Sequence, residues 1–294
     1  MSFDLRAFAA KPRLTDGVYG TELQKAGLRK PGGCLELLNI EDPSAIEAVA
    51  RSYVSAGSDV IMTNSLMAHR FGMAPYGLEN KASEIAQAAA AIACRAAKGT
   101  SVKVFGSFGP SGKIVMMGEV NEQELFDSFA QTAKALANGG AVAIVLETFN
   151  DLAEAEIALA AVKSVCDLPV VVSLAFAFGP DKTATMMGNT PADLAAMCKA
   201  KGAAAIGANC GIGPDVAVRL AQMLRAASDT PVWIKPNAGL PVVQNGKTVF
   251  PMNPDEFASF VPALVDAGVD FLGGCCGCGP EHIRATAQAL QRLD

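Results

Sequence analysis

The sequence predicts an α/β fold, a single (β/α)8 TIM barrel that forms one domain over residues 1–294. Short apolar, β-branched runs recur at intervals of about 30 to 45 residues, and Ala-rich segments with helical spacing lie between most of them. Eight such units indicate parallel strands joined by helices. A barrel of this kind needs about 250 residues, which this chain supplies with few left over. A doubly wound open sheet is the alternative, and the number of units favours the barrel.

The expected strands are short and apolar, as strands buried in a parallel sheet are. They cover residues 13–15, 59–63, 102–107, 142–146, 169–174, 204–208, 232–235 and 270–273. The expected helices cover residues 44–56, 81–97, 122–138, 153–165, 191–201, 214–226 and 253–267. Capping signals support several helix starts, as where Asn121 is followed three residues later by Glu124. Glycines such as Gly57 and Gly202 support the helix ends.

The composition narrows the classes of function. The chain is 51% hydrophobic and 18% charged, which allows a large buried core. The net charge is −5 and no long basic run occurs, so we expect no nucleic-acid partner. Residues 1–13 are too polar for a signal peptide, and no run of about 18 apolar residues predicts a membrane span. The eight cysteines then indicate buried thiols or metal ligands rather than disulfides, and the expected location is cytoplasmic.

Polar residues follow the expected strands at the point where each strand ends. They are Asp16, Gly17, Thr63, Asn64, Ser65, Glu147, Asn209, Cys210, Asn237, Cys275 and Cys276. The carboxyl ends of parallel strands meet at one mouth of a barrel, which is where barrel enzymes carry their active sites. We therefore expect these side chains to converge on one site.

Three of these cysteines predict a zinc site. Cys210 ends the sixth expected strand, and Cys275 and Cys276 end the eighth, on a turn flanked by glycine where both sulfurs can face one ion. Three protein ligands with one open position are typical of catalytic zinc, and thiolates favour zinc over harder metals. The alternative is a closed structural site, with Cys278 as the fourth ligand, in a binding module. The other cysteines are expected to pack, namely Cys34, Cys94, Cys166 and Cys198.

An open zinc position predicts thiol chemistry. A free thiol has a pKa of about 8.5 and is mostly protonated at neutral pH, whereas a thiol bound to zinc is deprotonated. With three cysteinate ligands the bound sulfur keeps electron density and would attack an activated methyl group. A barrel enzyme of another class, such as an aldolase, is the competing hypothesis. It needs a catalytic lysine at a strand end, and Lys235 is the candidate.

Seven short motifs, taken in order, resemble the homocysteine S-methyltransferase family. That family includes the homocysteine-binding module of cobalamin-dependent methionine synthase and the betaine–homocysteine methyltransferases. The similarity runs from Leu14 to His282. The motifs are Asp16-Gly17-Val18-Tyr19-Gly20-Thr21, Thr63-Asn64-Ser65, Gly109-Pro110, Glu147-Thr148, Gly207-Ala208-Asn209-Cys210, Pro236-Asn237-Ala238-Gly239-Leu240-Pro241 and Gly273-Gly274-Cys275-Cys276-Gly277.

The resemblance implies methyl transfer to the thiol of homocysteine, which gives methionine. It implies Zn²⁺ on Cys210, Cys275 and Cys276, with the homocysteine sulfur as the exchangeable fourth ligand. The amino group of homocysteine would be received by Asp16 and Glu147. Its carboxylate would be held by the backbone around Gly17 and by the turn Thr63-Asn64-Ser65. Asn209 would support the metal turn, and Asn237 would line the pocket.

The chain departs from the family pattern at several positions. Val18 and Tyr19 stand where the family has Gly or Ala and then Met, and Leu66 stands where Phe is frequent. Cys278 follows Gly277 where the family has Thr. Tyr19 would narrow the pocket, touch the methyl donor or simply pack. These changes concern the acceptor thiol and leave the metal ligands intact.

The methyl donor is expected to be a separate corrinoid protein in a split system. The chain has no Asp-x-His-x-x-Gly cobalamin motif, and its two histidines, His69 and His282, do not occur in that context. The alternative is an onium donor such as a betaine, a dimethylsulfonio compound or S-methylmethionine. An onium group favours aromatic faces, and one tryptophan and three tyrosines offer few of them.

Overall fold

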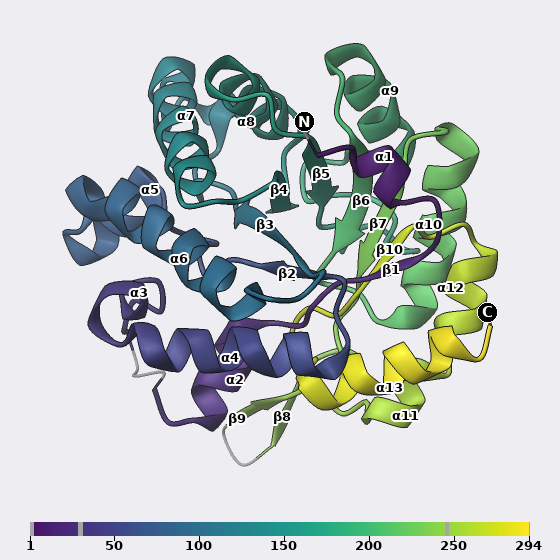
Figure 1. Cartoon of the computed structure of the whole chain (residues 1–294). Helices are drawn as coiled ribbons and strands as arrows, with labels where there is room; N and C mark the ends of the chain where they lie inside the picture. The colour runs from purple at the N-terminus through teal and green to yellow at the C-terminus, as the bar shows by residue number, and fades with distance from the viewer. Residues whose placement is uncertain (1–2, 29–31, 245–246, 294) are drawn as a thin grey trace.

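The computed structural model describes residues 3–28, 32–244 and 247–293 of the chain. Eight parallel strands form a (β/α)8 barrel, in the order β1-β10-β7-β6-β5-β4-β3-β2, with helices around it (Figure 1). The strands are β1 (Arg13–Leu14), β2 (Val60–Met62), β3 (Lys103–Phe108), β4 (Ala143–Phe149), β5 (Val170–Leu174), β6 (Ala205–Asn209), β7 (Val232–Lys235) and β10 (Phe271–Leu272). The predicted fold class is confirmed, because each expected strand is present within a few residues of its expected bounds.

The barrel closes between its first two strands by single hydrogen bonds rather than by a regular ladder. The backbone N–H of Asp59 donates to the carbonyl of Leu14 at 2.7 Å. Higher in the same seam, the backbone N–H of Met62 donates to Oδ2 of Asp16 at 2.7 Å. A side-chain carboxylate thus takes the place of a backbone acceptor, and the position of Asp16 depends on barrel closure.

The surrounding helices begin and end where the local sequence indicates. They are α4 (Pro43–Ala56), α6 (Ala82–Ala97), α7 (Glu122–Asn138), α8 (Leu152–Val165), α9 (Pro191–Lys201), α10 (Pro214–Ala227) and α13 (Pro280–Gln291). The capping box at Asn121 is formed, and Gly57 and Gly202 end their helices in the left-handed conformation. Within the described part of the chain, every helix is too short or too polar to cross a membrane.

The prediction is wrong for one helix. Residues 253–267 form two helices, α11 (Pro254–Ala258) and α12 (Val261–Asp266), rather than one. Pro262 is the cause, because a proline inside a helix has no N–H to donate to the preceding turn and its ring collides with that turn. The chain breaks at Ser259 and Phe260 and starts again with the proline in the first turn of α12.

Several smaller elements lie outside the expected ranges. The short helices are α1 (Leu5–Phe8), α2 (Tyr19–Lys25), α3 (Leu38–Glu41) and α5 (Arg70–Met73). A hairpin of β8 (Val242–Gln244) and β9 (Lys247–Val249) follows β7. After it, Phe250 packs so closely on Gly277 that no side chain would fit there. The hairpin segment thereby covers the back of the turn that carries Cys275 and Cys276.

The interior of the barrel is apolar at its N-terminal end. Phe105, Trp233 and Phe271 are fully buried there, and α1 lies beneath them with Leu5 buried and Phe8 packed on Phe271. A second, larger apolar layer fills the space between the strands and the outer helices. The polar side chains of the site lie at the opposite, C-terminal end.

Candidate active site

The three predicted metal-ligating cysteines meet at the mouth of the barrel. Cys210 follows β6, and Cys275 and Cys276 follow β10; their Sγ atoms all lie within 4.8 Å of one another. Sγ of Cys210 lies 3.8 Å from Sγ of Cys276. Two thiolates on one tetrahedral zinc are also about 3.8 Å apart, given Zn–S bonds of about 2.3 Å. The spacing of this pair therefore suits a zinc ion, and the sulfur of Cys275 lies near enough to share it.

Cys278 does not join this cluster. Its side chain is fully buried with Ala238 and Phe257, and its Sγ faces the carbonyl of Pro236 at 3.7 Å. Among the described residues, the group of cysteine, histidine and acidic side chains close enough to share an ion contains three cysteines and no fourth ligand. This geometry leaves one side of the cluster open to the pocket, as a catalytic zinc site requires.

Backbone strain and hydrogen bonds hold the ligands in place. Cys210 has φ 60°, in the left-handed region that non-glycine residues rarely adopt. The backbone N–H of Cys275 donates to the carbonyl of Pro236 at 2.8 Å, and that of Cys276 donates to Oδ1 of Asn237 at 3.1 Å. Asn237 therefore orients the turn of the two adjacent cysteines, and its buried side chain also interacts with Cys210.

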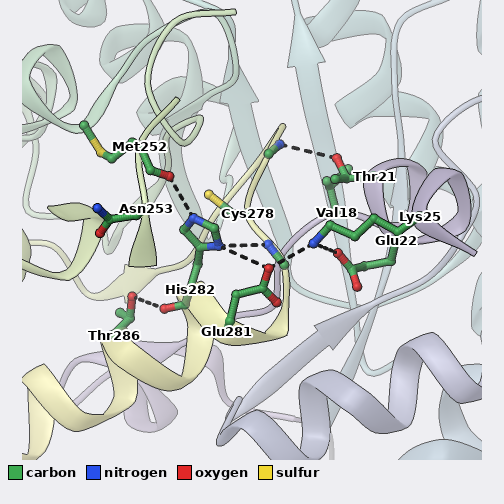
Figure 2. A network of polar contacts seen from close by, with 12 residues as sticks. Val18, Thr21, Glu22, Lys25, Met252, Asn253, Cys278, Glu281, His282 and Thr286 are labelled. Atoms are coloured by element: carbon green, nitrogen blue, oxygen red, sulfur yellow. Dashed lines mark hydrogen bonds and ion pairs between the residues drawn. The ribbon is translucent and has the colours of Figure 1, made fainter. Parts of the chain in front are cut away.

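A polar network anchors the far side of the same turn (Figure 2). The backbone N–H of Gly279 donates to Nδ1 of His282 at 3.3 Å, and Nε2 of His282 lies 3.0 Å from the carbonyl of Met252. His282 thus accepts at Nδ1 and donates from Nε2. Lys25 lies between Glu22 and Glu281 and links α2 to α13. The network ties the cysteine turn to the segment at Met252 and, through the start of α13, to α2.

The pKa values of the three thiols are shifted in different directions, because the thiols form hydrogen bonds with one another. Hydrogen bonds from the thiols of Cys275 and Cys276 lower the pKa of Cys210 far below its ordinary value. The hydrogen bond to Cys210 is also the largest cause that raises the pKa of Cys275 and of Cys276. Cys210 is thus the thiol of the cluster that loses its proton first, and the thiolate is the form that binds a metal cation.

A cavity of about 250 Å³ opens above the cysteines. It is lined by Gly17, Val18, Tyr19, Gly20, Leu35, Glu36, Met62, Thr63, Asn64, Ser65, Leu66, Glu147, Thr148, Cys210, Lys235, Gly274, Cys275 and Cys276. The cavity therefore brings together the three cysteines and five of the other residues that the sequence predicted, namely Gly17, Thr63, Asn64, Ser65 and Glu147. Gly17 cannot carry a side chain, because a Cβ would collide with the carbonyl of Cys278.

The hydroxyl groups of the turn after β2 form hydrogen bonds within the protein. The hydroxyls of Thr63 and Ser65 bond to each other, and Ser65 also donates to the carbonyl of Ser107 at 2.6 Å. The amide of Asn64 donates to the carbonyl of Leu35 and to Asn39. These bonds make the turn a rigid wall of the cavity.

Asn209 is buried behind the pocket, where it connects three strands. Its Oδ1 accepts from the backbone N–H of Thr148 at 2.9 Å and from the hydroxyl of Ser173 at 2.6 Å, and its Nδ2 donates to Oγ1 of Thr148 at 2.6 Å. Thr148 has φ 65°, a conformation that these bonds stabilise. Asn209 therefore orients two neighbours that face the pocket, Glu147 on one side and Cys210 on the other.

Asp16 lies beneath the pocket and does not line it. The carboxylate is fully buried, and its Oδ1 accepts from Nζ of Lys235 at 2.6 Å. Its Oδ2 accepts from the backbone N–H of Met62. Glu147 differs, because it faces the cavity; burial raises the pKa of its carboxyl, and the nearby charge of Lys235 opposes that rise. The two acids predicted to act together thus have different environments.

From the sequence, Lys235 is expected only as the lysine of a competing aldolase-type barrel, and Tyr19 as a residue that narrows the pocket, touches the methyl donor or packs; both line the cavity. Lys235 lines the cavity from the last position of β7, and a lysine at the end of an apolar strand was the available signal. Tyr19 also lines the cavity; its hydroxyl donates to the carbonyl of Met62 at 3.1 Å, and its ring packs on Tyr53. The residue therefore narrows the pocket from the side of α2.

Comparisons with known proteins agree with this arrangement. A family model described as homocysteine S-methyltransferase matches residues 13–290. Methionine synthase from Mycobacterium leprae (strain TN) is 31% identical over 99% of this chain and 25% of its own length. Methionine synthase from Mycobacterium tuberculosis (strain ATCC 25618 / H37Rv) is 31% identical over 95% of this chain and 24% of its own length. The chain thus spans about a quarter of the methionine synthases it matches.

A solved structure with the same fold is the homocysteine methyltransferase MmuM from Escherichia coli. Its oxidized form superposes with a TM-score of 0.80 at 23% identity and covers 100% of both chains. Its metallated form also superposes with a TM-score of 0.80, at 23% identity, and covers 97% of this chain and 99% of that one. At this level of identity the likeness establishes the barrel fold.

Proposed function

Because this chain belongs to the homocysteine S-methyltransferase family, we propose that it is a zinc-dependent enzyme that methylates the thiol of homocysteine to form methionine. The observation that carries the proposal is the cluster of Cys210, Cys275 and Cys276, whose sulfur spacing suits one tetrahedral zinc ion at the floor of a cavity. MmuM, which shares the fold, also has a metallated form, and this supports a metal-dependent enzyme. We also propose that residues 1–294 act as one domain.

Zinc bound by these cysteines would supply a positive centre that lowers the pKa of an incoming thiol and accepts its sulfur at the open position. The residues of the chain determine how that thiol is presented. Glu147 faces the cavity and is proposed to accept a hydrogen bond from the amino group of homocysteine. The backbone at Gly17 and the turn Thr63-Asn64-Ser65 form the wall against which its carboxylate would lie.

Asn209 and Asn237 act behind this surface. Asn237 holds the backbone of Cys276, and Asn209 holds the backbone of Thr148 next to Glu147. Both amides are buried and bonded to the protein, so we assign them positioning roles. Groups of this kind orient metal ligands and substrate-binding side chains.

The proposed methyl donor is a methylated corrinoid protein. Among the residues that the structure describes, Tyr19 is the one aromatic side chain in the lining of the cavity, which is too few for an aromatic cage around an onium group. The loops that follow the strands instead expose large apolar side chains around the mouth, namely Leu66, Met116, Met117, Phe178, Met186, Leu240 and Val243. An exposed apolar rim of this kind favours docking of a protein. The alternative donor is a free onium compound such as a betaine, a dimethylsulfonio compound or S-methylmethionine.

A donor screen tests the proposal. Purified, zinc-loaded protein is incubated with homocysteine and, in separate reactions, a methylated corrinoid protein, methylcobalamin, a betaine, a dimethylsulfonio compound or S-methylmethionine, and methionine is quantified by mass spectrometry. We expect about one zinc per chain and methionine formation with the corrinoid protein. Methylation of homocysteine by folded, zinc-free protein would contradict the zinc proposal, and turnover with an onium donor alone would select the alternative donor.

A further inference from the structure

A buried lysine occupies the floor of the acceptor pocket. Lys235 is 1% exposed, and its ammonium donates to Oδ1 of Asp16 at 2.6 Å. The carboxylate of Asp16 has its other oxygen bonded to the backbone N–H of Met62 at 2.7 Å. Both oxygens of Asp16 therefore have protein partners, and the carboxylate is fully buried beneath the lysine.

The ammonium itself has hydrogen-bonding capacity left over. It carries three donors, and the described residues give it one carboxylate and the sulfur of Met62, at 3.8 Å. Lys235 lines the cavity and Asp16 does not. The lysine thus separates the carboxylate from any molecule bound above the cysteines.

Two carboxylates line the cavity in the described part of the chain, those of Glu36 and Glu147. The carboxylate of Glu36 accepts from the backbone N–H of Met67 at 3.0 Å, and it therefore already binds the backbone of the loop after β2. Glu147 forms no ion pair with any residue that the structure describes, and it interacts with the side chain of Ser107 and with the nearby charge of Lys235. Glu147 is therefore the carboxylate best placed to meet an amino group that enters the pocket.

We propose that Lys235 is a specificity-determining residue for the acceptor thiol. Its ammonium neutralises Asp16 within the protein, so that the amino group of an acceptor is recognised through Glu147 alone rather than through two carboxylates. The acceptor class is then thiols that carry a carboxylate, with the α-amino group contributing modestly to binding. This inference rests on the proposed function, because it concerns the same thiol pocket.

The experiment compares two thiols that differ only in the amino group, homocysteine and 4-sulfanylbutanoate. Their affinities for zinc-loaded protein are measured by calorimetry, without a methyl donor, at pH 8.5. The variants are the wild type, K235M, and D16N/K235M, which replaces both charges by neutral side chains of similar size. The ratio of the two affinities isolates the contribution of the amino group, because the thiol and the carboxylate are common to both ligands.

We expect the ratio in favour of homocysteine to rise about tenfold or more in K235M, because an uncompensated Asp16 then attracts the ammonium. In D16N/K235M the ratio should stay within about threefold of the wild type, since two neutral side chains replace an ion pair whose net charge is zero. A ratio that falls about tenfold in the double variant would overturn the inference, because Asp16 would then contact the acceptor directly. An unchanged ratio in K235M would overturn it as well.

A ligand-free measurement covers the case in which K235M folds poorly. An unpaired buried carboxylate destabilises a protein, so K235M should melt below the wild type and the added D16N should restore most of the loss. If K235M cannot be purified, the ratio in the double variant against the wild type still decides the matter. If homocysteine binds and is methylated while the ratios contradict the expectation, this inference alone fails. If neither thiol binds the wild type, the proposed function fails with it.

Discussion

The N-terminal end of the barrel is closed by an apolar plug, whereas the C-terminal end carries buried charges, thiols and strained backbone. At the plug, the rings of Phe105, Trp233 and Phe271 pack on one another, with centroid separations of 5.4 to 6.3 Å. At the mouth lie the three non-glycine residues of the described chain that have positive φ, namely Thr148, Lys182 and Cys210. A non-glycine residue in the left-handed region costs about 1–2 kcal/mol. Two of these three residues, Thr148 and Cys210, line the cavity, whereas none of the three aromatic residues of the plug has a positive φ.

The largest expected effect comes from a change at the mouth that leaves the plug intact. Cys275→Ser replaces a thiolate by a hydroxyl that binds zinc weakly, so we expect loss of the metal and a fall in methyl transfer of about a thousandfold. Elemental analysis and a methionine assay measure the two effects. Cys166→Ser, a half-buried cysteine outside the site, is the matched control and should keep both zinc and activity.

The reverse change damages the plug and spares the mouth. Phe105→Ala should lower the free energy of unfolding by about 3–5 kcal/mol, because it leaves a cavity against Trp233 and Phe271. Denaturant titration gives this value. The folded fraction should keep its zinc and its KM for homocysteine. A change in KM at temperatures well below the melting point would show that the two ends are not independent.

An intermediate effect is expected from Asn209, which lies behind the pocket and orients residues that line it. Asn209→Ala removes three hydrogen bonds from Thr148 and Ser173 and should reduce kcat/KM for homocysteine about 10- to 100-fold. Ser173→Ala removes one of these bonds and should have a smaller effect in the same direction. Equal losses in the two variants would argue against a positioning role for Asn209.

A pH dependence is expected from a histidine outside the site. Burial lowers the pKa of His69 from 6.5 to about 4, and its Nδ1 accepts from the backbone N–H of Gly72. Above pH 6.5 the ring is neutral whether the chain is folded or unfolded. Below it, the unfolded chain binds a proton that the folded chain does not. Stability is therefore lost as the pH falls from 6.5 to 4, by about 3 kcal/mol from this residue.

A matched variant isolates this contribution. His69→Asn keeps a side-chain acceptor for Gly72 at the start of α5 (Arg70–Met73) and does not titrate in this range. Thermal unfolding measured from pH 4 to pH 8 should show a smaller acid loss in the variant than in the wild type. Parallel curves would mean that His69 is protonated in the native state.

The elements and the ligand set follow from information that is local in the sequence. Helix starts such as the capping box at Asn121 depend on residues three or four positions away, and the apolar runs of the strands depend on their own composition. The family resemblance, which the comparisons confirm, also rests on short contiguous motifs. For these reasons the barrel and the group of three cysteines can be predicted from the residues alone. Pro262 is a local signal of the same kind, and it explains why residues 253–267 divide into two helices where the apolar spacing predicts one.

Other features depend on which strands become neighbours, and only the closed barrel decides that. Lys235 and Asp16 are separated by 219 positions and meet because β7 and β1 face the same interior. The same is true of Asn209 and Thr148, whose hydrogen bonds join the ends of two strands. No local pattern encodes such pairs, since a side chain's partner across a barrel is set by strand order and register. The sequence by itself therefore determined the architecture and the candidate metal ligands, and the tertiary structure decided which acid faces the cavity and which is held by the lysine.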